Sequence, residues 1–197
     1  MIDFLFACAG FVSGSIPCSY IAAFIFSGKD VRTEGSGNVG ATNVFRVAGR
    51  SAGVAAAAGD VLKSLLPVLA ARLAGVPPLG QALTAAAVIA GHCYSPFLRF
   101  RGGKGVASTI TVSLLLCWPA ALAFGAVWLG VFLVSGYVSL ASILASFALP
   151  LGSTLASADL STTVFFSLAA LFVLYKHRTN VRRLFDGTES RMRGKRG

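Results

Sequence analysis

The chain has 197 residues, of which 55% are hydrophobic and 12% are charged, and its mean hydropathy is +0.76. Soluble domains carry charge on about a quarter of their residues, so this composition excludes an ordinary soluble domain. It predicts a single polytopic membrane domain over residues 1–197. The formal net charge of +10 then describes one membrane face, where basic residues meet anionic headgroups.

Apolar segments follow one another along almost the whole chain. A helical span needs about 20 apolar residues, and fewer when the helix is short or the bilayer thin. The region after Gly105 holds either three long helices or four short ones. Taking four, we expect an all-α bundle of about seven transmembrane helices, at Phe4–Phe26, Ala52–Ala74, Leu79–Leu98, Val106–Pro119, Ala120–Ser135, Val138–Ser157 and Leu160–Tyr175.

The basic residues decide the expected orientation. All of the 17 lysines and arginines except Lys63 and Arg72 lie in three polar segments, around residues 29–50, 99–104 and 176–196. Basic residues concentrate in cytoplasmic loops, so all three segments are predicted to be cytoplasmic. An even number of spans must then separate the second from the third, which favours four short helices. The N-terminus is expected outside and the C-terminus in the cytoplasm.

The first polar segment, residues 32–46, reads RTEGSGNVGATNVFR. Glycines there let backbone N–H groups approach a ligand closely, and successive amides next to a helix start can bind phosphate. A flexible glycine-rich loop is the other interpretation. Gly35, Gly37 and Gly40 would expose these amides, Ser36, Thr42 and Asn43 add short polar groups, and Arg32 and Arg46 add charge at the rim.

The second polar segment, residues 91–109, places Lys104 among glycines just before an apolar run. A compact cation beside backbone donors suits an anionic ligand. The pattern is not a Walker A loop, because Lys104 is followed by Gly105 rather than by Ser or Thr. His92 is interpreted either as a hydrogen-bonding residue at a helix end or as a catalytic residue.

The third polar segment, residues 175–189, reads YKHRTNVRRLFDGTE. His177 and Asn180 are three residues apart and are predicted to share a helix face. The alternative is a polybasic anchor beside the membrane, an interpretation we also apply to the basic tail at 190–197. Polar groups kept at the edge of a helical bundle are functional candidates. Together the three segments predict one site for phosphorylated substrates at the cytoplasmic face.

These segments resemble the bacterial acyl-phosphate-dependent glycerol-3-phosphate acyltransferases of the PlsY type. The resemblance rests on GSIP with Tyr20, GSGNVGATN, HCYSPFLRFRGGKGVAS and KHRTNVRRLFDGTE, in that order along the chain. It implies a multi-pass protein of the bacterial cytoplasmic (inner) membrane. It also implies transfer of a fatty acyl group from acyl phosphate to the 1-hydroxyl of sn-glycerol 3-phosphate, giving lysophosphatidic acid and inorganic phosphate.

Site residues follow from the same resemblance. It implies that Ser36, Lys104, His177 and Asn180 are catalytic, and that the substrate is bound by Gly37, Asn38, Gly40, Thr42, Asn43 and Arg46. No cofactor and no metal are expected. The partners are acyl phosphate, glycerol 3-phosphate and membrane lipids, with no nucleic acid and no protein partner identified.

The expected mechanism is direct transfer, because an acyl phosphate is already activated. The sequence has no GxSxG nucleophile elbow, and the needs are charge neutralisation, alignment and stabilisation of the oxyanion. The base is either His177 or a phosphate oxygen of the donor. The alternative functions are a transporter of a small organic phosphate and, less favoured, a lipid phosphatase. A transporter predicts paired inverted repeats and charges near the bilayer midplane. The sequence shows neither, because Asp60 and Lys63, the only ionisable pair inside a predicted span, lie one helical turn apart and can pair.

Overall fold

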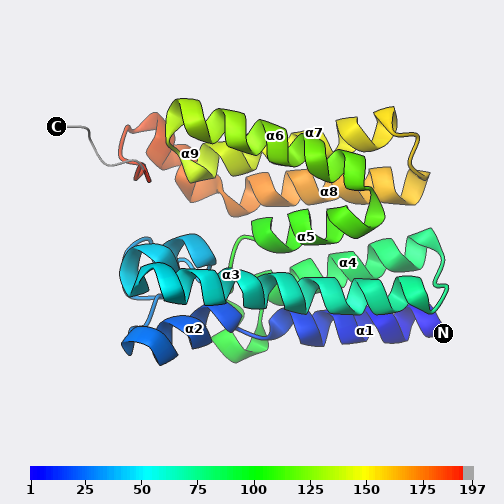
Figure 1. Cartoon of the computed structure of the whole chain (residues 1–197), viewed down its shortest axis with the longest axis horizontal. Coiled ribbons are helices and arrows are strands. Elements are labelled where there is room, and N and C mark those ends of the chain that lie inside the picture. Colours follow the sequence, from blue (N-terminus) through cyan, green and yellow to red (C-terminus); the bar gives the residue numbers. More distant parts are fainter. Residues whose placement is uncertain (193–197) are drawn as a thin grey trace. The chain divides into compact units, whose positions relative to one another are not determined.

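In a computed structural model that describes residues 1–192, the chain is helical, and that range contains no strand. The predicted all-α class is therefore correct. The α-helices, separated by short connections and one 3-10 turn (Pro96–Leu98), are α1 (Ile2–Ser15), α2 (Cys18–Ser27), α3 (Ala41–Leu73), α4 (Pro78–Cys93), α5 (Val106–Leu116), α6 (Trp118–Ser135), α7 (Val138–Leu155), α8 (Leu160–Lys176) and α9 (Arg178–Phe185) (Figure 1).

Each predicted span coincides with a helix or a pair of helices. By length and apolarity, four segments of residues 1–192 could cross a membrane, and five if the bent pair α8–α9 counts as one span. Helix α5 has 11 residues and is therefore about 16 Å long, roughly half of a hydrocarbon core. The count of seven spans and the orientation of the termini stay predictions.

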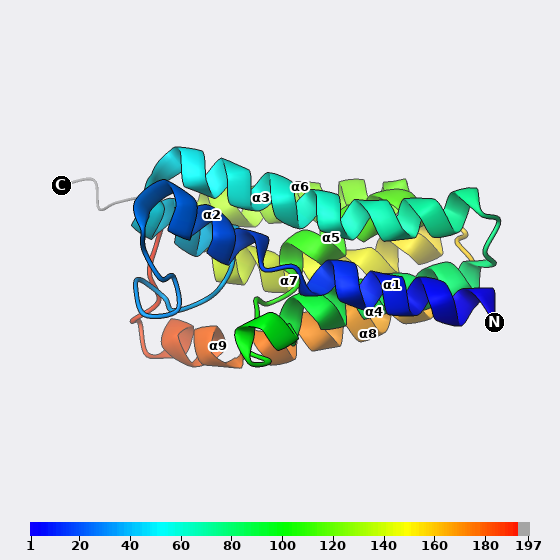
Figure 2. The ribbon, with the colours of Figure 1, turned by 90° about the horizontal axis from the view of Figure 1, so that it is seen from below.

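The chain divides into two compact units, residues 1–115 and 116–197. The single polytopic domain also stays a prediction, as does the role of the basic tail, of which residues 193–197 lie outside the described part. In the first unit α1 lies along α4, and α2 lies along α3 (Figures 1 and 2). A methyl group at Gly14 would lie 2.2 Å from the backbone oxygen of Val88. Small residues therefore let α1 and α4 pack backbone to backbone.

The first predicted span is broken in two. Pro17 lacks an N–H group, and Ile16 before it takes an extended conformation (φ −57°, ψ 121°), as residues before proline do. The break separates α1 from α2. At the break the backbone oxygen of Ile16 makes no i to i+4 bond and accepts instead from the Cys18 N–H (3.0 Å), in the middle of an apolar segment where backbone polar groups need partners.

Helix α3 is interrupted near its start by Gly49, whose φ of 88° lies in the region that favours glycine. The short piece before Gly49 contains the end of the first polar segment. The longer piece after it contains Asp60, Lys63 and Pro67, and all three are buried.

The second unit contains α6 to α9. Helix α7 packs against α6 and α8, and α9 turns away from α8 by 56° (Figure 2). The turn falls at His177, which ends α8 and precedes α9. His177 is the N-terminal cap of α9 and Asn180 lies in its first turn, so no helix break separates them, and their sharing one helix face stays a prediction.

Candidate functional site

Asn43 shapes the first polar segment. Its side chain is 1% exposed, and its Oδ1 accepts a hydrogen bond from the backbone N–H of Ser36 (2.9 Å). Its Nδ2 donates to the backbone oxygens of Val31 (2.9 Å) and Glu34 (3.0 Å). One buried amide thus ties three points of the loop to the first turn of α3.

The same hydrogen bonds determine which loop amides can meet a ligand. The N–H of Ser36 is held by Asn43, and the N–H of Gly37 donates to the oxygen of Glu34 (3.0 Å). Helix α3, in contrast, begins at Gly40 with no side chain capping its first turn. The first N–H groups of a helix lack intrahelical acceptors and favour anions. The N–H groups at the start of α3, at Ala41 and Thr42, are therefore the amides of this loop that suit an anion, and phosphate binding here stays a prediction.

The first polar segment also carries hydroxyl groups and two arginines. Ser36 and Arg46 are exposed, and Arg46 makes no ion pair among residues 1–192. Arg32, in contrast, is paired with Asp30 through contacts of 2.6 to 3.1 Å. The hydrogen bonds from Arg32 lower the pKa of the Asp30 carboxyl. Arg46 is thus the arginine of this segment whose charge is not compensated within the described chain.

The second polar segment packs against the end of α4. The N–H of Gly103 donates to the oxygen of His92 (3.1 Å), and the N–H of Gly102 donates to the oxygen of Cys93 (3.2 Å). A methyl group at Gly103 would lie 2.1 Å from His92 Nε2 and 2.7 Å from the backbone oxygen of Val39. Glycine is required here because the loop that carries Lys104 lies directly on the first loop and on His92.

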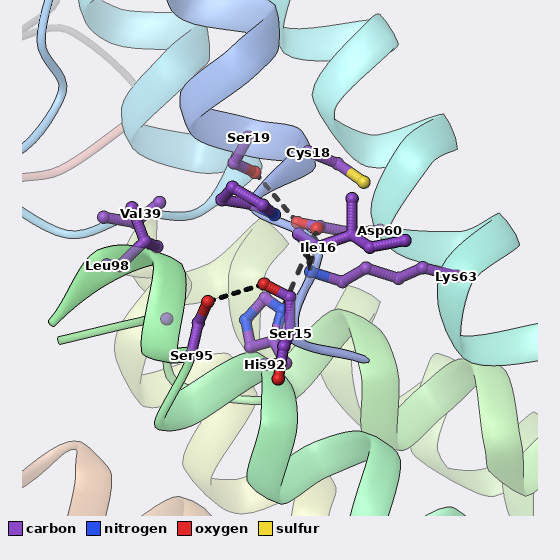
Figure 3. Close-up of a pocket in the computed structure, with 12 residues that line it drawn as sticks. Ser15, Ile16, Cys18, Ser19, Val39, Asp60, Lys63, His92, Ser95 and Leu98 are labelled. Carbon is purple, nitrogen blue, oxygen red and sulfur yellow. Dashed lines mark hydrogen bonds and ion pairs between the residues drawn. The ribbon is translucent and has the colours of Figure 1, made fainter. Parts of the chain in front are cut away.

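The two loops meet over a small pocket with a charged floor (Figure 3). Lys63 and Asp60 form an ion pair of 2.8 Å, and both are buried. Ser19 donates to the other carboxylate oxygen of Asp60 (2.8 Å), and His92 Nδ1 lies 3.8 Å from Asp60 Oδ1. The expectation that Asp60 and Lys63 can pair is confirmed. The sequence did not predict the contacts of this pair with α2 and α4, nor its position beneath the two loops.

The third polar segment builds a separate cluster in the second unit. His177 is buried, and its Nδ1 lies 2.8 Å from the backbone oxygen of Val173. Since a carbonyl only accepts, Nδ1 carries the proton and Nε2 is the ring nitrogen that can accept one. Asn180 is also buried, and its Nδ2 donates to Glu189 Oε1 (2.7 Å). Because Nδ2 faces Glu189, the orientation of the Asn180 amide, and with it the position of its oxygen, is fixed.

Glu189 organises this cluster, a role that the sequence alone did not reveal. Its carboxylate accepts from Ser139, Asn180 and Arg183, each at 2.7 Å. Burial works to raise the pKa of Glu189, but these hydrogen bonds prevail and lower it. The available signal was an acidic residue following a run of arginines, which can fold back onto that run.

The predicted site residues therefore fall into two groups. The structure brings the first two polar segments together in residues 1–115, and it places His177 and Asn180 in the second unit. Convergence of all three segments stays a prediction. No group of three potential metal-ligating side chains occurs among the described residues.

The sequence of the whole chain decides the family. Residues 4–187 match the family model described as glycerol-3-phosphate acyltransferase. The chain belongs to this family. A relative in Desulforudis audaxviator, named glycerol-3-phosphate acyltransferase, is 43% identical over 181 residues, covering 92% of this chain and 91% of the relative.

Two crystal structures of a glycerol-3-phosphate acyltransferase have the same fold. Both are of PlsY (YgiH), an integral membrane enzyme, and both are 35% identical to this chain. The glycerol 3-phosphate form superposes with a TM-score of 0.93 and covers 98% of this chain and 96% of that one. The lysophosphatidic acid form superposes with a TM-score of 0.87, covering 97% and 95%. The chain is thus a multi-pass membrane protein of the PlsY type, as its sequence predicts.

Proposed function

We propose that this glycerol-3-phosphate acyltransferase moves a fatty acyl group from acyl phosphate to the 1-hydroxyl of sn-glycerol 3-phosphate. The products are lysophosphatidic acid and inorganic phosphate. The main support for this proposal is the structural similarity, over 98% of the chain, to an enzyme crystallised in a glycerol 3-phosphate form. A related crystal form with lysophosphatidic acid supports the product.

In this proposal the first unit, residues 1–115, holds the phosphate of glycerol 3-phosphate. The start of α3 supplies backbone donors, because its first turn has no side-chain cap. Arg46 and Lys104 add positive charge, and Ser36, Asn38 and Thr42 add short polar groups at the loop. Gly37 and Gly40 keep side chains away from the ligand. Asn43 acts by holding the loop in shape, since its amide is already bonded to loop backbone.

His177 and Asn180 handle the acceptor hydroxyl in this proposal. With the proton on Nδ1, His177 Nε2 accepts the proton of the glycerol hydroxyl. Asn180 presents its amide oxygen to a substrate hydroxyl, because its nitrogen is engaged by Glu189. A phosphate oxygen of the donor is the alternative base, and a His177→Ala variant that keeps its rate would favour it.

The reaction balances without a cofactor. The 1-hydroxyl oxygen attacks the acyl carbonyl carbon, the proton passes to the base, and the bond between the acyl carbon and the phosphate oxygen breaks. Phosphate leaves with the bonding electron pair, and cations of the site stabilise its negative charge. No covalent acyl-enzyme is needed, because the donor is already activated.

The test is an assay of the purified full-length protein in nanodiscs. Palmitoyl phosphate and labelled glycerol 3-phosphate should give labelled lysophosphatidic acid and one equivalent of phosphate, whereas palmitoyl-CoA should give none. Product from palmitoyl-CoA alone would overturn the donor assignment. Uptake of glycerol 3-phosphate into proteoliposomes without acylation would instead support the transporter alternative, which family membership disfavours. The proposed location is the cytoplasmic (inner) membrane of a bacterium.

A further inference from the structure

The ion pair of Asp60 and Lys63 is buried on α3, inside an apolar helix, and the reaction proposed above does not use it. Charged groups at such positions are costly and are retained for a function. Asp60 is 1% exposed and Lys63 is 6% exposed. Both side chains point into the pocket beneath the two loops (Figure 3).

Lys63 holds the break between α1 and α2. Its Nζ donates to the backbone oxygen of Ile16 at the break (2.8 Å), which also accepts from the backbone N–H of Cys18 (3.0 Å). Ser13 in turn donates to the backbone oxygen of Lys63 (2.7 Å). The ammonium group therefore fixes the end of α1 against α3.

Asp60 connects that break to the loops. It accepts from Ser19 in the first turn of α2 (2.8 Å) and lies 3.8 Å from His92 Nδ1 at the end of α4. The other side of the His92 ring abuts Gly103, where an added methyl group would be 2.1 Å from Nε2. Gly103 immediately precedes Lys104 and also contacts the backbone of Val39.

We propose that Asp60, Lys63 and His92 are positioning residues: they form a rigid polar floor that sets where Lys104 and the Asn38–Gly40 backbone lie relative to each other. The proposal rests on the function proposed above, in which these two loops hold the phosphate of glycerol 3-phosphate. A displacement of about 1 Å at a binding group costs up to roughly 100-fold in rate. The floor therefore affects how well the two loops bind the substrate, although its own side chains do not contact the substrate.

Removing the two charges one after the other distinguishes a positioning role from a purely stabilising role. Asp60→Asn leaves the Lys63 ammonium buried without its carboxylate, which destabilises the protein. Adding Lys63→Met removes that unpaired charge and should restore the melting temperature to within a few degrees of wild type. Positioning predicts that the double variant still has a KM for glycerol 3-phosphate at least about 10-fold above wild type. A stability role predicts that KM recovers with the melting temperature.

A second variant approaches the floor from α4 without disturbing the ion pair. His92→Ala removes the ring on which Gly103 rests and should raise KM for glycerol 3-phosphate about 10-fold, with kcat within about threefold of wild type. Thr84→Val is the matched control. Thr84 is also buried on α4, and its hydroxyl donates to the backbone oxygen of Gly80 one turn earlier in the same helix (2.8 Å). This control should leave KM within twofold.

Calorimetric binding of glycerol 3-phosphate to the same proteins keeps the two proposals apart. Weakened binding in both the double variant and His92→Ala, beside a normal Thr84→Val, is the expected result. Normal binding and KM in either folded variant, with an active wild type, would overturn the positioning role alone. A wild type that neither binds glycerol 3-phosphate nor forms product would overturn both proposals.

Discussion

Replacing Asn43 by alanine should disorder the first loop without unfolding the protein. The substitution removes three hydrogen bonds, to Ser36 N–H and to the oxygens of Val31 and Glu34. Each is worth about 1 kcal/mol net, so the folded loop loses about 3 kcal/mol. Water reaches part of this loop and recovers some of that energy. We therefore expect a fall of about 100-fold in kcat/KM for glycerol 3-phosphate, equivalent to about 2.7 kcal/mol.

Hydrogen exchange at the Ser36 amide distinguishes loop shaping from direct contact with the substrate. In wild type this amide is protected by Asn43, and in Asn43→Ala it should exchange close to the rate of an open loop. Thr33→Ala is the matched control, because Thr33 lies in the same loop and makes only an exposed bond to Asp30. It should change kcat/KM less than threefold. Unchanged protection of the Ser36 amide in Asn43→Ala would refute the reasoning, even if activity fell.

Three further predictions concern charge, packing and pH. Arg46→Ala should lower kcat/KM for glycerol 3-phosphate by about 30-fold, because a hydrogen bond to a charged group contributes about 2 kcal/mol. Arg50→Ala, which removes another exposed arginine of α3, should lower it less than threefold, and equal losses in a steady-state assay would contradict the assignment. Gly14→Ala should lower the free energy of unfolding by about 1 to 3 kcal/mol, because its methyl group would lie 2.2 Å from the backbone of α4. Gly130→Ala is the control: an added methyl group there meets nothing within 4 Å, so its melting temperature should equal or exceed that of wild type. The pKa of Glu189 is lowered from 4.5 in the folded protein, so its contribution to stability is complete above that value and is lost as the pH falls through the folded pKa. Glu189→Gln should therefore melt about 4 to 8 °C below wild type at pH 7, for a loss of about 2 kcal/mol. The difference in melting temperature should close at lower pH, and a constant difference down to pH 3 would contradict the prediction.

The sequence alone predicted the helical class, the membrane location and the boundaries of the apolar segments. These properties depend on composition and on runs of neighbouring residues, and a bilayer accepts few structures besides helices. The candidate loops were also visible locally, because glycines and cations stand out within an apolar chain. The family resemblance then followed from the order of those polar segments, and the match over residues 4–187 confirms it.

Only the tertiary structure decided what individual polar residues do. Asn43 was predicted as one of several ligand-binding residues, yet its amide is bonded to loop backbone between residues 31 and 36. The sequence predicted no role for Glu189, yet three donors, one from α7 and two from α9, converge on its carboxylate. The contacts of Asp60 with Ser19 and His92 join residues 32 or more positions apart. A local pattern shows that a residue is polar and where it stands on its helix, whereas its partner depends on how distant helices pack, and that packing is determined by the whole chain.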